Sequence, residues 1–258
     1  MHASNFDLPT YLQRIGYTGH VCADTATLGA LMRQQLFTVP FENLDVQAGK
    51  VVSLVPEEIA DKILRQGRGG YCYEVNGLFA MALQALGISY QFVAARPMFY
   101  PARRPRTHMA LVAEVEGRRW LCDLGFGSYG IRAPMDLELL DVHIAQDCDT
   151  FQLTRDERGE YLLKALVDGE WANQYGFDLS PQEWIDFVPA NYLNSTHPEA
   201  IFVQKLVVVQ HHRTGRSILL GDMLKTMSDG MTEKKQLDPG EIGAVLLNQF
   251  RLTPLQTS

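Results

Sequence analysis

Residues 68–79 read Arg-Gly-Gly-Tyr-Cys-Tyr-Glu-Val-Asn-Gly-Leu-Phe, which places Cys72 directly after a Gly-Gly pair. Apolar residues then recur at helical spacing as far as Gly87, a typical helix stop. We therefore predict a helix that begins near Cys72 and ends near Leu86. Unpaired backbone N–H groups and the macrodipole at a helix N-terminus favour a thiolate. The stretch predicts a reactive cysteine, which is catalytic only if a base and an orienting group come from elsewhere in the chain.

The length and composition of the chain favour an ordinary globular protein. Its 258 residues suffice for one large domain or a few small ones, with a core that needs no disulfide or metal. Hydrophobic residues make up 46% and charged residues 21% of the chain, which is typical of globular proteins. The net charge of -7 argues against general nucleic-acid binding.

Signals for secretion and membrane insertion do not stand out in the sequence. The N-terminal residues lack the basic and then apolar pattern of a secretory signal, and no run reaches the roughly 18 apolar residues of a membrane span. The four cysteines lie far apart without C-x-x-C spacing, which argues against a disulfide framework and against a zinc site. We expect a cytoplasmic protein that does not associate with membranes, and its oligomeric state stays open.

The hydrophobic pattern changes along the chain from helical to extended and then to mixed. Helices are expected at residues 8–15, 27–36, 56–66 and 72–86. Strands are expected at residues 90–95, 107–115, 118–124, 150–153, 161–167 and 171–177. The last part should contain a helix at 181–193, strands at 202–210 and 217–220, and a helix at 240–248. This order predicts an α+β fold in which an antiparallel meander or barrel follows a helical region.

The stretch 107–124 predicts a two-stranded hairpin that turns at residues 116–117. In that register Ala110 pairs with Asp123, and His108 shares a face with Ala110. His108 and Asp123 are then diagonal neighbours, roughly 7–8 Å apart at the backbone. A slip of one residue would move Asp123 to the other face. The hairpin therefore offers a base and an orienting acid, which are the two groups that a Cys-His-Asp triad requires.

Each member of this triad also has an ordinary structural interpretation. A cysteine at a helix start can simply be buried, and a histidine on a strand can be a core residue. An acid at the end of a strand is commonly a turn or capping residue. Their joint placement favours the triad over these separate explanations.

Five segments of the chain resemble the arylamine N-acetyltransferase family. They are residues 11–17 (Tyr-Leu-Gln-Arg-Ile-Gly-Tyr), 39–44 (Val-Pro-Phe-Glu-Asn-Leu), 68–72 (Arg-Gly-Gly-Tyr-Cys), 107–109 (Thr-His-Met) and 123–127 (Asp-Leu-Gly-Phe-Gly). They span the first half of the chain in the family's order, and together they are highly specific. The resemblance implies Cys72 as nucleophile, His108 as base and Asp123 as orienting acid.

The resemblance also implies a fold with a cysteine-protease or transglutaminase-like core. A helical domain (1–87) would carry the nucleophile, an antiparallel β-barrel domain (88–195) would carry the His and Asp, and an α/β domain (196–258) would act as a lid. The implied reaction transfers acetyl from acetyl-coenzyme A, through an acetyl-cysteine, to arylamine or hydrazine nitrogens or arylhydroxylamine oxygens. Such a role in xenobiotic metabolism uses acetyl-coenzyme A as a co-substrate and needs no permanently bound cofactor.

The family likeness assigns further residues to the site. Those placed against coenzyme or acceptor are Tyr73, Thr107, Gly125, Phe126 and Gly127. Phe41 and Phe202 are candidate aromatic walls for a flat substrate, with plain core packing as the alternative. The resemblance implies a structural ion pair between Glu42 and Arg68. Backbone N–H groups near Tyr73 are candidate oxyanion donors, and we assign no metal site.

Several alternatives need to be weighed. Residues 125–130 match G-x-G-x-x-G, but residues 131–134 do not start a helix convincingly, so we reject a dinucleotide-binding turn. The arginines at 96, 103, 104 and 106 form either a solvated loop or a positive field for coenzyme A phosphates. A Cys-His-Asp triad would also serve a transglutaminase-like or hydrolytic enzyme, and the fold would also suit a non-catalytic binding module.

Overall fold

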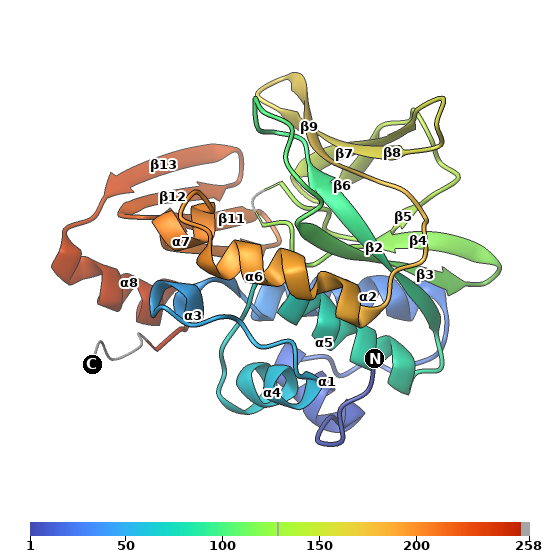
Figure 1. Cartoon of the computed structure of the whole chain (residues 1–258), viewed down its shortest axis with the longest axis horizontal. Coiled ribbons are helices and arrows are strands. Elements are labelled where there is room, and N and C mark those ends of the chain that lie inside the picture. Colours follow the sequence, from blue (N-terminus) through green and yellow to red (C-terminus); the bar gives the residue numbers. More distant parts are fainter. Residues whose placement is uncertain (128, 254–258) are drawn as a thin grey trace.

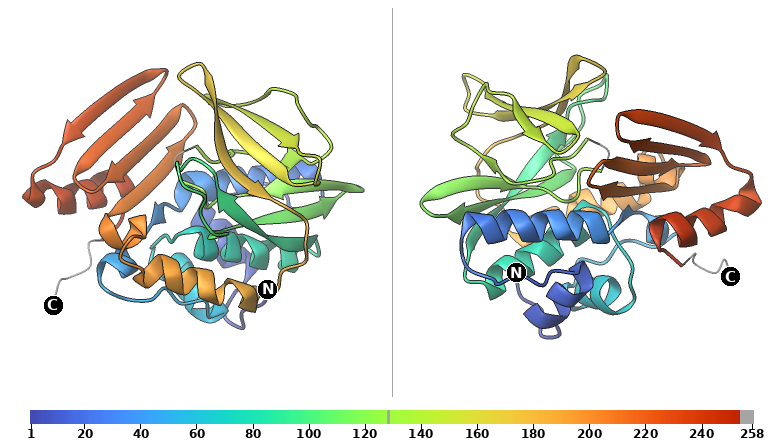
Figure 2. Two further views of the ribbon diagram at one scale, coloured as in Figure 1. Left: turned by 45° about the horizontal axis from the view of Figure 1, so that its top comes forward. Right: turned by 180° about the vertical axis from the view of Figure 1, so that it is seen from behind.

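The chain folds into a group of helices, a large curled sheet and a smaller second sheet beside it (Figures 1 and 2). The structure is a computed structural model and describes residues 1–127 and 129–253. Its α-helices are α1 (Leu8–Ile15), α2 (Thr25–Thr38), α3 (Leu44–Gln47), α4 (Pro56–Ala60), α5 (Cys72–Ala85), α6 (Val188–Thr196), α7 (Ile201–Gln204) and α8 (Ile242–Phe250). Within this part of the chain, no helix is long and apolar enough to cross a membrane.

Thirteen strands complete the described structure. They are β1 (Phe41–Glu42), β2 (Ser89–Pro97), β3 (His108–Val115), β4 (Arg118–Cys122), β5 (Met135–Asp136), β6 (Ile144–Gln146), β7 (Asp149–Arg155), β8 (Tyr161–Val167), β9 (Glu170–Phe177), β10 (Val207–His212), β11 (Gly215–Leu220), β12 (Met223–Ser228) and β13 (Met231–Gln236).

Local sequence signals explain where the first helices begin. The side chain of Asp7 accepts a hydrogen bond from the backbone N–H of Thr10 at 2.8 Å, and Asp24 accepts one from that of Thr27 at 2.7 Å. Such N-caps satisfy amides that have no partner inside the helix, and the predicted cap at Asp24 is confirmed. The third predicted helix is α4 followed by a π-helical turn over Asp61–Arg65.

The large sheet contains eight strands in the order β5-β4-β3-β2-β9-β8-β7-β6, and every neighbouring pair is antiparallel. It is the curled antiparallel sheet that the alternating pattern predicts. Helix α5 contacts β2 and β3, and its residues 72–83 are all buried. The helix that begins at Cys72 therefore lies at the centre of the main hydrophobic core.

The smaller sheet has the order β1-β10-β11-β12-β13. Its first strand comes from the N-terminal part of the chain, where Phe41 pairs with Val209. A separate small core joins this sheet to α8. Strand β13 was not predicted from the sequence, because all six of its residues are exposed and show no alternation of apolar and polar side chains.

Two predictions for the last third of the chain have other bounds in the structure. The helix expected at 181–193 is present but lies three residues later, as a 3-10 turn at Trp184–Phe187 followed by α6, which ends at Thr196. The strand expected from Phe202 begins only at Val207, because residues 201–204 form the short helix α7. The Asn43 side-chain amide stabilises this helical turn by donating hydrogen bonds to the carbonyls of Phe202 and Lys205 at 2.7 and 2.8 Å.

Candidate active site

Cys72 is the first residue of α5 and is 3% exposed. The Glu74 carboxylate accepts a hydrogen bond from the backbone N–H of Tyr71, the residue before the helix, at 3.1 Å. A side chain added at Gly69 would lie 1.9 Å from the Pro40 carbonyl oxygen, so this position requires glycine. The Gly-Gly pair thus lets the loop pass tightly against residue 40 and deliver the thiol to the N-terminus of a buried helix.

A network of buried charges holds the loop before Cys72. The guanidinium of Arg68 contacts the Glu42 carboxylate at 2.8 Å, which confirms the expected ion pair. The ammonium of Lys62 contacts Asp45 at 2.5 Å and Glu74 at 2.6 Å. Burial raises the pKa of Glu74 to about 7, although the Lys62 charge opposes this change. Asp45, Lys62, Arg68 and Glu74 line a cavity separate from the pocket at Cys72, so the role of the network is to position the loop.

The hairpin of β3 and β4 has the predicted register. Val115 pairs with Arg118 and Leu111 with Cys122, so Asp123 follows β4 on the face that His108 shares. The His108 Nε2 atom lies 2.7 Å from Asp123 Oδ2. The predicted hydrogen-bonded His–Asp pair is therefore present in the structure.

Asn76 is a buried site residue that sequence analysis missed. Its side-chain amide donates hydrogen bonds to the Met109 carbonyl at 2.7 Å and to Asp123 Oδ1 at 3.1 Å. Its side-chain oxygen accepts a hydrogen bond from the backbone N–H of Leu124 at 2.8 Å. Asn76 lies one helical turn after Cys72 and ties the nucleophile helix to β3 and to the loop that follows β4. A polar residue at this spacing on an otherwise apolar helix face was the available signal.

The buried ionisable groups favour charged forms of the His–Asp pair. Burial alone would lower the pKa of His108, but the charge and hydrogen bond of Asp123, together with a hydrogen bond to the Cys72 side chain, raise it to about 10. Burial alone would raise the pKa of Asp123, yet His108 and hydrogen bonds from Gly125 and Asn76 hold it below its usual value. At neutral pH the resting site therefore contains an imidazolium between the thiol group and a carboxylate.

Tyr175 is a second buried residue that the sequence did not reveal. Its ring lies 5.0 Å from the His108 ring and 4.9 Å from the Phe126 ring, measured between centroids. Burial and the nearby charge of Asp123 raise the pKa of Tyr175 well above its usual value, so its hydroxyl stays protonated. The aromatic packing restricts how the imidazole can turn.

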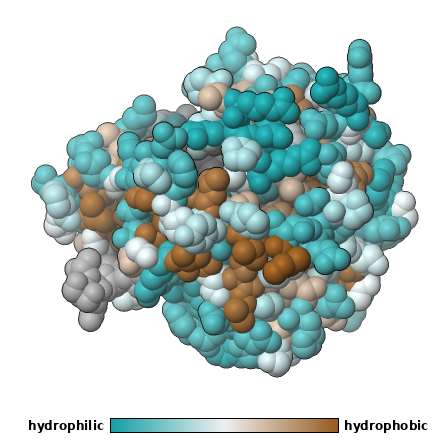
Figure 3. Space-filling view, viewed as in Figure 1, coloured by the Kyte–Doolittle hydropathy of each residue, from teal (hydrophilic) through white to brown (hydrophobic). Residues whose placement is uncertain are grey.

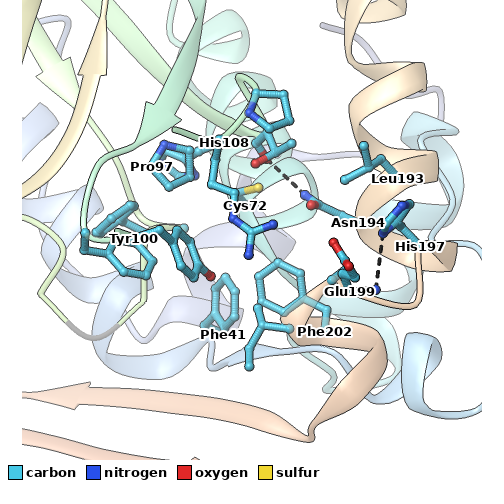
Figure 4. A pocket seen from close by; sticks show the side chains of 18 residues that line it. Phe41, Cys72, Pro97, Tyr100, His108, Leu193, Asn194, His197, Glu199 and Phe202 are labelled. Carbon is cyan, nitrogen blue, oxygen red and sulfur yellow. Dashed lines mark hydrogen bonds between the residues drawn. The ribbon is translucent and has the colours of Figure 1, made fainter. Parts of the chain in front are cut away.

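A pocket opens onto Cys72 (Figure 4). Its lining includes the predicted contact residues Phe41, Thr107, Gly125, Phe126 and Phe202. Tyr73 and Gly127 do not belong to the lining that the described residues form. The Tyr73 hydroxyl instead donates a hydrogen bond to the Thr107 carbonyl at 2.8 Å, and the Gly127 carbonyl lies 2.9 Å from His211 Nε2. The aromatic side chains of the lining offer a flat apolar surface beside the thiol.

Beside the pocket, the surface over α6 and α7 carries an apolar patch. Figure 3 shows apolar residues gathered over these helices, and the exposed side chains of α6 and of the 3-10 turn before it include Ile185, Val188 and Leu193. Leu193 also lines the pocket. The Asn194 amide donates a hydrogen bond to the Thr107 carbonyl at 3.0 Å, which joins α6 to the residue before His108 (Figure 4).

The glycine-rich loop after Asp123 contacts the nucleophile helix. A side chain added at Gly125 would lie 2.5 Å from Cys72 Cα, so only glycine fits against the start of α5. The loop leads to strand β5 and not to a helix, which confirms that its G-x-G-x-x-G match is no dinucleotide-binding turn. Among residues 1–127 and 129–253, no three His, Cys, Asp or Glu side chains are placed to hold a metal ion.

A family model and the curated relatives of this chain agree on its family. A family model described as N-acetyltransferase matches residues 24–256. The arylamine N-acetyltransferase of Mycolicibacterium smegmatis is 34% identical over 252 residues, which cover 95% of this chain and 91% of that protein. The chain belongs to the arylamine N-acetyltransferase family.

Other arylamine N-acetyltransferases support the same assignment. The Escherichia coli (strain K12) protein is 31% identical over 247 residues, covering 94% of this chain and 87% of its own length. The structure of the Mycobacterium abscessus protein matches with a TM-score of 0.90 at 32% identity and covers 96% of this chain and 90% of that one. As a member of this family, the protein is an acyltransferase with the expected helix-and-sheet fold.

A solved complex adds a ligand to the comparison. The structure of Mycobacterium marinum arylamine N-acetyltransferase in complex with CoA matches with a TM-score of 0.89 at 31% identity. It covers 95% of this chain and 92% of that one.

Proposed function

We propose that this protein transfers acetyl from acetyl-coenzyme A to arylamines in two half-reactions, with the acetyl group carried on Cys72. The observation that supports this most directly is the arrangement of three side chains beside one pocket. Cys72 and His108 line the pocket together, and Asp123 Oδ2 lies 2.7 Å from the imidazole Nε2. This order of nucleophile, base and orienting acid is what acyl transfer requires.

In the first half-reaction, the Cys72 thiolate attacks the thioester carbonyl of acetyl-coenzyme A. The carbon–sulfur bond to coenzyme A breaks, and the imidazolium of His108 donates its proton to the departing coenzyme A thiolate. Exchange of one thioester for another keeps the free-energy change small. Backbone N–H groups near Tyr73, in the first turn of α5, are our candidates for stabilising the negative oxygen of the intermediate.

In the second half-reaction, the acceptor nitrogen attacks the acetyl group on Cys72. Acetylation removes the Cys72 thiol group, whose hydrogen bond and charge raise the pKa of His108 in the resting enzyme. The neutral imidazole can then accept a proton from the attacking amine as the bond to sulfur breaks. Asp123 keeps the imidazole oriented throughout.

The proposed acceptors are arylamines, hydrazines and arylhydroxylamines, as in xenobiotic metabolism. Phe41 and Phe202 support this class of acceptor, because their ring centroids lie 5.8 Å apart in the pocket wall and present apolar faces to a flat ring. We further propose acetyl-coenzyme A as co-substrate. The CoA-bound structure of the Mycobacterium marinum relative supports this choice of donor.

We also propose that residues 1–87, 88–195 and 196–258 act as three functional units, with the last as the lid. The pairing of β1 with β10 supports a lid that is anchored to the first unit.

The alternative functions are hydrolysis and transglutaminase-like transfer, which would use the same triad with water or a lysine amine as acceptor. A non-catalytic module is disfavoured because all three triad positions are filled.

Mixing the protein with acetyl-coenzyme A is expected to add one acetyl group to Cys72, because the thiol is the nucleophile that attacks the donor. Intact mass spectrometry should detect this addition in the wild type and not in the Cys72→Ala variant. Cys22 provides a matched control, since it is an exposed free cysteine and Cys22→Ala should still be acetylated. An acetyl group that persists in Cys72→Ala would contradict the proposal. Adding aniline should then release the group as acetanilide.

Alkylation of Cys72 by iodoacetamide is expected to remain fast well below the pKa of about 8.5 of an ordinary thiol. The imidazolium of His108, whose pKa is raised to about 10, should stabilise the thiolate across neutral pH. The alkylation rate measured from pH 5 to 9 checks this, and His108→Gln should shift the profile upward. A wild-type midpoint near pH 8.5 would show that no such ion pair exists in the resting enzyme.

A further inference from the structure

The end of β2 and the loop that follows it form a wall between two cavities. Pro97 and Arg104 line the pocket at Cys72. Their chain neighbours Arg96 and Arg103 line a second cavity, against β7 and β8. Among the described residues, the two cavities have no lining residue in common. A ligand in the second cavity therefore leaves the space in front of the thiol open.

Arginines from two distant parts of the chain line the second cavity. From β2 and the loop after it they are Arg96, Arg103 and Arg106, and from the end of β7 and the turn after it they are Arg155 and Arg158. The whole chain, in contrast, has a net charge of -7. The second cavity is therefore a local positive region on an otherwise acidic protein.

The carboxylates near this cavity neutralise only part of its positive charge. The guanidinium of Arg106 contacts Glu160 at 3.0 Å and Asp178 at 2.6 Å. Asp156 instead accepts hydrogen bonds from the backbone N–H groups of Arg158 and Glu160, at 2.9 and 2.8 Å. In the part of the chain that the structure describes, the other four arginines of the lining form no ion pair within 4.0 Å.

Arg96 shows the effect of crowding these charges. Burial lowers the pKa of its guanidinium, and the positive charges of Arg103 and Arg106 lower it further. Its Nη1 atom also donates a hydrogen bond to the carbonyl of Arg104, which holds the guanidinium against the loop. Like charges that are held together raise the free energy of the folded protein, and an anion with several negative groups would offset this cost.

The chemistry of the lining defines the kind of anion that fits. A guanidinium can donate two parallel hydrogen bonds to one phosphate group. Because the arginines come from two separate segments, several linked phosphates suit them better than a single one. Tyr161 is the only aromatic side chain that the described residues contribute to the lining, and its buried ring already lies 5.0 Å from the guanidinium carbon of Arg155. The lining therefore favours recognition of phosphates over stacking of a base.

We propose that this cavity is a second ligand site, which binds the linked phosphates of a small polyanion such as a nucleoside triphosphate or inorganic tripolyphosphate. Its volume of about 430 Å³ lies in the range of small-molecule sites. The arginines of both segments hold the phosphate oxygens, while the Cys72 pocket on the other side of the wall keeps its own ligands. The site is thus additional to the proposed acetyl transfer and does not depend on it.

Isothermal titration calorimetry with tripolyphosphate tests the proposal, and the melting temperature of each variant serves as a folding check. Arg103→Gln and Arg158→Gln change exposed residues of the two segments. Each is expected to weaken binding by about tenfold or more, as the loss of a hydrogen-bonded charge pair allows. Arg213→Gln is the matched control, because it removes the same charge from an exposed turn between β10 and β11, outside the cavity. Its affinity should equal that of the wild type.

Titrations with ATP and with coenzyme A identify the source of the phosphates. ATP that binds more tightly than tripolyphosphate would support a nucleotide as the ligand, and equal affinities would support the phosphate chain alone. Coenzyme A is expected to bind Arg103→Gln and Arg158→Gln as it binds the wild type, and to leave tripolyphosphate in place.

Three outcomes would overturn the inference. The first is a wild-type protein that does not bind tripolyphosphate, and the second is an affinity that neither cavity variant changes. The third is displacement of tripolyphosphate by coenzyme A together with equal weakening of both ligands in both variants, which would assign the cavity to the acetyl donor. Because binding is measured without catalysis, a failure of the proposed acetyl transfer would leave these results unchanged.

Discussion

Replacing Asp123 with asparagine is expected to lower the rate of acetyl transfer by roughly 10³–10⁴-fold while the protein stays folded. Both carboxylate oxygens accept hydrogen bonds in the structure. Oδ2 lies 2.7 Å from His108 Nε2, and Oδ1 accepts from the backbone N–H of Gly125 at 2.9 Å and from Asn76 at 3.1 Å. In either orientation of an asparagine at this position, its amide nitrogen would face another hydrogen-bond donor. The imidazolium would lose its counter-ion, and the imidazole would be held in the wrong tautomer.

Stopped-flow measurement of Cys72 acetylation, with the melting temperature as a folding check, tests this expectation. Asp168→Asn is a suitable control because Asp168 is exposed in the turn between β8 and β9, at a positive φ of 52° that asparagine tolerates. The same Asp123→Asn change should move the alkylation profile of Cys72 toward that of an ordinary thiol. Near-normal acetylation by Asp123→Asn would remove the acid from the proposed mechanism.

Replacing Asp149 with alanine is expected to destabilise the protein by about 3–5 kcal/mol, which is the usual cost of leaving a buried charge unpaired. Asp149 is shared by two arginines that are almost completely buried. Arg132 is 0% and Arg216 1% exposed, and their guanidiniums contact the carboxylate at 2.5 and 2.7 Å. Arg132 also donates hydrogen bonds to the carbonyls of His212 and Gly215, both at 2.8 Å. The cluster therefore ties the hairpin of β10 and β11 to the start of β7.

Thermal unfolding should show this loss as a fall in melting temperature of roughly 10 °C. Glu241→Gln, which removes an exposed ion pair with Lys235, should change the melting temperature little. Replacing all three clustered residues by leucine or methionine should recover much of the loss, because apolar side chains of similar volume leave no buried charge. A fall in the Asp149→Ala variant no larger than that of Glu241→Gln would contradict the expectation.

The stability that the ion pairs of Asp149 contribute depends on pH, and this dependence follows from the pKa of Asp149. Burial opposes ionisation, but the hydrogen bonds and charges of Arg216 and Arg132 hold the folded-state pKa below the usual value. A carboxyl with a depressed folded-state pKa stabilises the protein above its unfolded pKa of about 3.9 and loses that contribution in more acidic solution. The difference in melting temperature between the wild type and Asp149→Ala should therefore become smaller only in acidic solution.

Local patterns were sufficient to predict the parts of the site that depend on short stretches of chain. The helix from Cys72 follows from apolar spacing, and the His108–Asp123 pair follows from the two-residue period of a hairpin with a defined turn. In both cases the deciding interactions lie within one element or between neighbouring strands. The segments shared with the arylamine N-acetyltransferase family pointed to the same three residues.

Contacts between distant parts of the chain were not predictable in this way. Phe202 was expected in a strand, but Asn43, which precedes it by 159 residues, stabilises the turn of α7 there. The Asp149 cluster joins residues from β7, β11 and the loop before β5, none of which carries a distinctive motif. Tyr175 reaches His108 only because β9 pairs with β2 in the curled sheet.

The sequence by itself determined where the nucleophile helix begins, that His108 and Asp123 lie on the same face of the hairpin, and to which family the chain belongs. Only the tertiary structure decided which of the clustered arginines enters the pocket and which buried groups orient the triad. Periodicity states which face of an element is apolar, because that property repeats along the chain. It does not state which other element covers that face, since this depends on packing between residues far apart in sequence.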